Sequence, residues 1–345
     1  MACKWLFRLS YSDSLIEGLF KMTISKDDLE NRQLQQLQQQ VGINKSLKVL
    51  PTHRELEFLA TYKKIEYDQY TIAGLYDVRK IHALMNNSNA FYNEKERLKE
   101  IVQQLGKDAF FTPAISIKAL GTDTTNNLCI LQEEAGFDRI SIFEKNNEQS
   151  VDEMTAQIKE IKNKFKDKKL FPVLSVGINK RHLLKEKVIA LKKIGFSEIG
   201  VYFSGYWKYK NNILELSNID RVNRPNIVFC GIWERLNNTP LPVVMALFGF
   251  EKISSGFKWG ATSRGNKKPA LRRLDEMKIA YYVMPHSEIE HIRLNERVMP
   301  EDIYKFIKAE SYQKSVRIIE RLKSLGSNSL NELVQKNKYL NYLFA

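Results

Sequence analysis

The sequence predicts an α/β protein whose core is a TIM-like (β/α) barrel, either complete or incomplete. Short apolar runs rich in β-branched and aromatic residues recur between residues 109 and 284, and several end in glycine. Segments with helical periodicity separate most of them, which is the pattern of repeated strand–helix units with a parallel sheet. About seven such runs favour a barrel over an open doubly wound sheet. No GxGxxG opens a strand–helix turn, so a dinucleotide-binding fold has no support.

This pattern divides the chain into three regions. Residues 1–105 are expected to be mainly helical, residues 106–290 to form the barrel core, and residues 291–345 to form a C-terminal helical segment. The strands that we expect span 110–117, 139–143, 170–177, 198–205, 226–232, 251–257 and 280–284. The helices that we expect span 55–64, 71–85, 94–105, 122–135, 151–168, 180–195, 300–325 and 328–343, with a loop at 86–89 and a cap at Thr122 or Asp123.

Composition excludes several classes of protein. With 43% hydrophobic and 11% aromatic residues in 345, the chain can bury a core and is not a disordered protein. No apolar run approaches the roughly 20 residues needed to span a bilayer, so we expect no membrane association. Arg8, Asp13 and Glu17 interrupt the apolar N-terminal patch, so we expect no signal peptide.

The cysteine and histidine patterns give no support to a metal site. The three cysteines lie far apart and form no CxxC pattern, which argues against a disulfide scaffold and a zinc cluster and predicts a cytoplasmic protein with reduced thiols. His286 and His291 are five residues apart and so do not share a helix face. We therefore expect no metal and no cofactor. His286 could transfer a proton, although a surface histidine is the simpler interpretation.

The net charge of +14 and the isoelectric point near 9.4 give information about the binding partners of the protein rather than about its fold. Nucleic acid is the leading candidate, with acidic membranes or plain surface lysine enrichment as alternatives. A basic cluster without acids, interleaved with glycines, could approach a phosphate backbone, or it could be a solvated loop. The residues that we expect to contact nucleic acid are Lys208, Lys258, Arg264, Lys267, Lys268, Arg272 and Arg273.

Acids and tryptophans follow the expected strands. Glu144 and Glu234 each come just after an apolar run, so both could act as acid, base or nucleophile at a barrel mouth. Alternatively, each caps a helix or pairs with a cation such as Lys145 or Arg235. The tryptophans after three successive strands could stack an extruded base or could pack beneath the loops. They are Trp207, Trp233 and Trp259.

The segments over residues 130–265 share an order and spacing with a known family. Residues 172–177, 191–196 and 200–205 form a strand, a helix end and a second strand, and 226–232 forms a third. The layout of 247–255 and of 263–266 continues the pattern, and 134–144 precedes it. In this order the chain resembles the tRNA-guanine transglycosylase family, including relatives that insert deazaguanine bases into DNA. That resemblance implies a TIM-like barrel.

The resemblance also implies roles for individual residues. Glu144 falls where the family has an aspartate that helps recognise the base, and Gly177, Gly205 and Gly231 fall at its substrate-binding strand ends. The position of the family's nucleophilic aspartate is occupied in this chain by Ser254 or Ser255. Asp123 is the acid nearest to the position of a second aspartate of the family, or it is a helix cap. The family's three zinc-binding cysteines and histidine are absent from this sequence.

Three functions stay open at this level. The first is an enzyme of the transferase class that exchanges a guanine or 7-deazaguanine base in DNA or tRNA at the N-glycosidic bond. The second is a catalytically silent, nucleic-acid-binding or partner subunit of a modification or defence system, acting with a protein partner or as a homodimer. The missing aspartate and zinc ligands favour the second. A barrel enzyme acting on a small metabolite is the third.

Overall fold

The computed structural model describes residues 44–62, 67–115, 120–145, 149–176, 181–203, 216–217, 219–220, 222–232, 249–254, 279–283, 289–293 and 303–336. Residues 42–323 form one compact unit, and residues 1–41 with 324–345 form a second. The described part of the second unit includes the helix α13 (Ser327–Lys336), in which Lys336 and Glu332 pair at 2.5 Å one turn apart.

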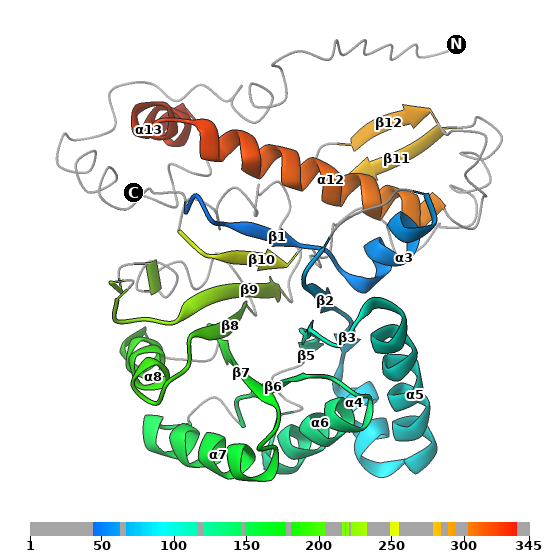
Figure 1. Ribbon diagram of the computed structural model, residues 1–345, viewed down its shortest axis with the longest axis vertical. Coiled ribbons are helices and arrows are strands. Elements are labelled where there is room, and N and C mark those ends of the chain that lie inside the picture. Colours follow the sequence, from blue (N-terminus) through cyan, green and yellow to red (C-terminus); the bar gives the residue numbers. More distant parts are fainter. Residues whose placement is uncertain are drawn as a thin grey trace. The chain divides into compact units, whose positions relative to one another are not determined.

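The centre of the first unit is a six-stranded sheet in which every pair of neighbours is parallel (Figure 1). Its strands, in spatial order, are β1 (Lys48–Leu50), β10 (Lys252–Ser254), β9 (Asn226–Ile232), β8 (Glu198–Phe203), β7 (Lys169–Ser175) and β6 (Arg139–Phe143). Two further parallel pairs are β2 (Tyr70–Ile72) with β4 (Ala109–Phe111) and β3 (Leu75–Tyr76) with β5 (Ala114–Ile115). The predicted α/β class is therefore confirmed.

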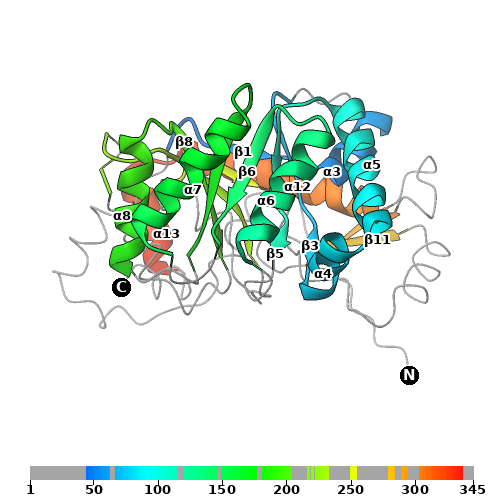
Figure 2. The ribbon, with the colours of Figure 1, turned by 90° about the horizontal axis from the view of Figure 1, so that it is seen from below.

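Helices follow most of the strands in the chain. They are α3 (His53–Tyr62), α4 (Val78–Asn86), α5 (Ser88–Leu105), α6 (Thr122–Glu134), α7 (Val151–Lys164), α8 (Arg181–Lys193) and α12 (Ile303–Ser324). Figure 2 shows α8, α7, α6 and α5 in this order from left to right, and Figure 1 shows that they curve around the outside of the strands. Within the described residues, no helix is both long and apolar enough to cross a membrane.

Most of the predicted elements are confirmed in type. The strands at 139–143 and 226–232 have the predicted bounds, and the helix at 122–135 ends one residue early. The predicted strand at 110–117 is divided into β4 and β5. Thr112 and Pro113 separate the two, and proline cannot donate to a strand ladder. Apolar periodicity was therefore a sufficient signal for these strands and for this helix, but it did not predict β1 of the central sheet.

The helix predicted over 71–85 is wrong in its first part. Tyr70–Ile72 and Leu75–Tyr76 are strands there, and α4 begins only at Val78. Asp77 caps it, because its side chain accepts a hydrogen bond from the backbone N–H of Lys80 at 2.8 Å. Tyr70, Ile72 and Tyr76, which precede Asp77, are buried, and this tertiary burial overrides the helical spacing.

Three smaller expectations also need correction. Gly121 is the N-cap of α6 and makes no side-chain capping bond, so neither Thr122 nor Asp123 is the cap. The loop predicted at 86–89 is nearly absent, because Asn87 caps α5 by accepting from the N–H groups of Asn89 and Ala90. The late strand, β11 (Ile279–Val283), pairs antiparallel with β12 (Ile289–Arg293) and takes no part in the parallel sheet.

A closed circuit of five side chains joins the amino ends of β2, β4, β6, β8 and β10. Arg139 of β6 bonds to Asp108 and to Glu198 of β8, at 2.9 Å each. Lys252 of β10 lies 2.6 Å from Glu198 and 2.8 Å from Gln69, and Gln69 donates to Asp108 at 3.0 Å. The circuit carries two cations and two anions, so its charges balance. We call it the amino-end circuit.

The next layer of the interior is aromatic. The rings of Phe110 and Phe171 meet edge to face at 4.8 Å, and the guanidinium of Arg139 lies 4.2 Å from the ring centre of Phe110. Gly200 of β8 leaves room for this layer, because an added Cβ would come within 2.8 Å of Phe171 and 2.7 Å of the sulfur of Cys230. The amino-end circuit and the aromatic rings that contact Arg139 are therefore two successive layers of the interior.

A glutamine completes the bonding of β6 on its outer edge. Gln132 of α6, which is fully buried, accepts from the N–H of Ser141 at 2.7 Å and donates to its carbonyl at 3.0 Å. The side-chain amide therefore takes the place of a neighbouring strand at this residue. Nearer the amino end, the N–H of Asp138 donates to the carbonyl of Lys107 at 3.2 Å and connects β6 to the start of β4.

Candidate functional site

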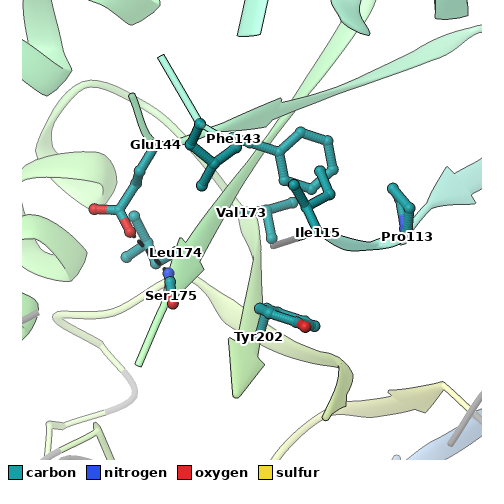
Figure 3. Close-up of a pocket in the computed structure, with 9 residues that line it drawn as sticks. Pro113, Ile115, Phe143, Glu144, Val173, Leu174, Ser175 and Tyr202 are labelled. Atoms are coloured by element: carbon teal, nitrogen blue, oxygen red, sulfur yellow. Dashed lines mark hydrogen bonds between the residues drawn. The ribbon is translucent and has the colours of Figure 1, made fainter. Parts of the chain in front are cut away.

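A pocket opens at the carboxyl ends of β5, β6, β7 and β8 (Figure 3). Its cavity volume is about 20 Å³, and its empty space, including the part open to solvent, is about 320 Å³. Parallel strands present their carboxyl ends at one edge, which is where α/β proteins bind ligands. The lining residues are Pro113, Ile115, Leu120, Phe143, Glu144, Val173, Leu174, Ser175 and Tyr202. Most of these side chains are apolar, so the pocket favours an apolar or aromatic group.

Tyr202 places a hydroxyl group in this apolar setting. Its side chain is 8% exposed, and its hydroxyl has no hydrogen-bond partner within the part of the chain that the structure describes. Burial raises the pKa of Tyr202, so the hydroxyl stays protonated and can donate. Gly231 of β9 is the register partner of Tyr202, where the ladder between β8 and β9 is irregular.

Glu144 follows β6 directly and is buried in an ion pair. Its Oε1 lies 2.6 Å from the ammonium of Lys187, and its Oε2 accepts a hydrogen bond from the N–H of Ser175 at 2.8 Å. Figure 3 shows its carboxylate pointing away from the hydroxyl of Tyr202, towards Ser175. Of the two interpretations from the sequence, these contacts favour the cation pair, with Lys187 of α8 as the cation rather than Lys145.

Two glutamines hold the backbone on either side of Glu144. Gln157 of α7 donates to the carbonyl of Phe143 at 3.4 Å and accepts from Gln149 at 2.6 Å. Gln149 in turn accepts from the N–H of Lys145 at 3.1 Å. All these bonds come from α7 and its preceding turn. The carboxyl end of β6 is therefore fixed by side chains as well as by its ladder.

Ser254 ends β10 at the same edge of the sheet as Glu144 but does not line the pocket. It is fully buried, and its hydroxyl lies 2.9 Å from the hydroxyl of Thr71. Asp123 is an exposed residue in the first turn of α6 and is also absent from the pocket lining. Among the described candidates, the pocket therefore holds Glu144 and lies beside Gly231, and it excludes Ser254 and Asp123.

The other predicted site residues lie outside the described residues. These include the second acid, the second serine, two glycines and the three tryptophans, together with the whole basic cluster. They are Glu234, Ser255, Gly177, Gly205, Trp207, Trp233, Trp259, Lys208, Lys258, Arg264, Lys267, Lys268, Arg272 and Arg273.

Three residues of the site were missed by the sequence interpretation. Lys187 shares the apolar stripe of α8 with Leu184, Val188 and Leu191, and a lysine in such a stripe is a signal of a buried partner. Tyr202 is a polar-tipped residue inside an apolar strand. Ser175 precedes the predicted Gly177 by two residues, and no sequence signal marked its N–H as the one that bonds to Glu144.

No protein-family model matches this chain, and no curated protein sequence matches it. Among the described residues, no group of three or more His, Cys, Asp or Glu side chains could hold a metal ion.

Proposed function

We propose that the protein is a (β/α) barrel enzyme that takes a nucleobase of DNA or tRNA into the pocket beside Tyr202. The reaction that we propose is exchange of a guanine or 7-deazaguanine base at the N-glycosidic bond. The observation that carries the proposal is a largely apolar pocket, with the buried hydroxyl of Tyr202 in its lining, at the carboxyl ends of parallel strands in a chain of net charge +14. Enzymes that modify a base extrude it into such a pocket.

Contacts between the separate sheets support closure into a barrel. Thr52, just after β1, forms a parallel bridge with Thr71 of β2, and β2 pairs with β4. The start of β4 bonds to β6 through the N–H of Asp138. The amino-end circuit passes through the ends of β2, β4, β6, β8 and β10 and returns to its origin, as expected if these strands surround one interior.

The proposed roles differ from those expected from the sequence. Glu144 is engaged with Lys187 and Ser175, so we assign it to holding the tips of β6 and β7 against α8. Tyr202 and the apolar walls would hold the base. The attacking group would come from Glu234 or Ser255, since Ser254 is bonded to Thr71 in the interior.

A labelled-base exchange assay tests the reaction. Purified protein would be incubated with radiolabelled guanine or a 7-deazaguanine and with either DNA or tRNA, and incorporation would be counted. We expect incorporation into one of the two nucleic acids, and we expect Glu234→Gln or Ser255→Ala to abolish it. Full incorporation by both variants would show that neither Glu234 nor Ser255 supplies the attacking group. No incorporation by the wild type would contradict the exchange reaction.

A second candidate function is nucleic-acid binding without catalysis, as a subunit of a modification or defence system. The burial of Ser254 and its bond to Thr71 favour it, because one of the two serines that fall at the position of the family's nucleophile does not line the pocket. Binding that weakens steeply with salt, without base exchange, would support this candidate. An absence of binding even at low salt would contradict both candidates and favour a small-molecule substrate.

The proposal places the protein in the cytoplasm. Cys129 and Cys230 are both buried free thiols. Burial raises the pKa of Cys129 to about 12, and it also raises the pKa of Cys230, so neither is a ready thiolate at neutral pH. Reduced thiols of this kind suit a reducing compartment.

A further inference from the structure

We infer that Tyr202 is the specificity-determining residue of the pocket, and that its hydroxyl donates a hydrogen bond to an acceptor on the bound ring. The acceptor would be a carbonyl oxygen or an unprotonated ring nitrogen. The inference rests on the proposed function only for identifying that ring as a nucleobase. The requirement for an acceptor comes from the pocket itself.

The first argument is the cost of an unsatisfied hydroxyl. The Tyr202 side chain is 8% exposed, and its hydroxyl has no partner among the residues that the structure describes. Leaving such a group unsatisfied costs about 1–3 kcal/mol, so buried polar groups generally find partners. The equivalent group of Tyr70, in β2, follows this rule, because its hydroxyl donates to the carbonyl of Gly106 at 2.7 Å.

The second argument is the position of the side chain. Tyr202 lines the pocket together with Val173, Ile115 and Phe143, whose side chains offer no hydrogen-bonding atom. Figure 3 shows its ring below Val173 and Ile115, with the hydroxyl on the side opposite Glu144. The carboxylate of Glu144 is engaged by Lys187 and the N–H of Ser175. Among the lining residues, the side-chain hydroxyls belong to Tyr202 and Ser175, and Figure 3 shows Ser175 beside Glu144 and Tyr202 below the apolar side chains.

These two arguments define the chemistry of the ligand. The apolar walls favour an apolar, flat ring over a charged group, and the neutral phenol of Tyr202 would offer that ring a donor. A ring with an acceptor gains a hydrogen bond that is absent from the empty pocket. A ring of the same size without an acceptor leaves the hydroxyl unsatisfied. Sites of this kind discriminate strongly against analogues that lack the polar partner.

The test compares Tyr202→Phe with Tyr70→Phe in the full chain. Three bicyclic probes would be used: hypoxanthine, a nucleobase with a carbonyl; isoindolinone, a lactam that is not a nucleobase; and indole, which has no acceptor. Dissociation constants and melting temperatures would be measured for each protein. For the wild type, we expect hypoxanthine and isoindolinone to bind more tightly than indole.

The two variants should respond in opposite ways. Tyr202→Phe should weaken binding of the two carbonyl probes about tenfold and leave the melting temperature unchanged or higher, because it removes a hydroxyl without a protein partner. Its affinity for indole should be unchanged. Tyr70→Phe should lower the melting temperature, because it leaves the Gly106 carbonyl without its donor, and should bind all three probes like the wild type.

Three results would overturn the inference, and a fourth would separate it from the proposed function. A melting temperature lowered by Tyr202→Phe as much as by Tyr70→Phe would show that the hydroxyl bonds within the protein. Unchanged affinity of that variant for the carbonyl probes would remove its role in specificity, and so would a wild type that binds none of the probes. Binding of isoindolinone but not hypoxanthine, lost in Tyr202→Phe, would uphold the inference and refute the nucleobase proposal.

Discussion

The ammonium of Lys187 lies 2.6 Å from Oε1 of Glu144, and both side chains are almost completely buried. One comes from the middle of α8 and the other from the end of β6, so the pair joins the helix layer to the edge of the sheet that carries the pocket. A buried charge is tolerated only when it is paired and hydrogen-bonded. The N–H of Ser175 supplies a further hydrogen bond to Glu144.

We predict that Lys187→Met will destabilise the protein by about 3–5 kcal/mol, because it leaves the buried Glu144 without its cation. The free energy of unfolding from urea denaturation measures this. The double variant Lys187→Met with Glu144→Gln should lose much less than the sum of the single losses. Lys192→Met, at an exposed position on the same helix, is the matched control and should change stability little. Additive losses in the double variant would mean that the two groups are not coupled.

Arg139 is the branching point of the amino-end circuit, because it bonds to Asp108 and Glu198 at once. We predict that Arg139→Met will lower the free energy of unfolding by about 3 kcal/mol, since two carboxylates lose a shared cation. Arg79→Met, at an exposed position on α4, provides the comparison. Equal stabilities of the two variants would show that the circuit contributes nothing.

The stability should fall in acid because of Glu94. Burial by itself would raise the pKa of Glu94, but hydrogen bonds from Arg97 and Tyr76 and the charges of Arg97 and Lys80 outweigh it and lower the pKa to about 2. A depressed pKa in the folded state stabilises the protein above the unfolded value, near 4.5, and this contribution is lost as the pH falls towards 2.

We predict that Glu94→Gln will cost on the order of 3 kcal/mol at pH 7 and progressively less below pH 4.5. Urea denaturation of the wild type and the variant at pH 7, 5 and 3.5 would show the two stabilities converging in acid. Glu100→Gln, at an exposed position of the same helix, should match the wild type at each pH. A constant gap between Glu94→Gln and the wild type would contradict the prediction.

Gly200 is predicted to tolerate no side chain. An added Cβ would lie 2.7 Å from the sulfur of Cys230 and 2.8 Å from the ring of Phe171, so Gly200→Ala should lower stability by about 1–3 kcal/mol. Gly74→Ala is the control, because its Cβ would meet no atom closer than the ring of Tyr76, at 3.4 Å. Thermal unfolding distinguishes the two, and equal melting temperatures would show that the interior can adjust.

The local hydrophobic pattern of the sequence was enough to predict two of the buried strands, at 139–143 and 226–232. Residues 227–230 form a continuous, buried apolar run, and such runs occur where a parallel strand is covered on both sides. Residues 139–143 are also buried throughout, although Arg139 and Ser141 are polar. The pattern failed at 71–85, where two short strands precede a helix. It also gave no information on whether the strand at 279–283 pairs in parallel or antiparallel, because pairing joins residues distant in sequence.

The sequence alone determined the α/β class, most of the elements, the basic charge and the placement of Glu144 directly after a strand. Only the tertiary structure decided what each polar residue does there. It paired Glu144 with Lys187, buried Ser254 against Thr71, and left Tyr202 facing an apolar space. The reason is physical: periodicity reports which residues are buried, whereas hydrogen bonds and ion pairs depend on distances between segments that only folding brings together.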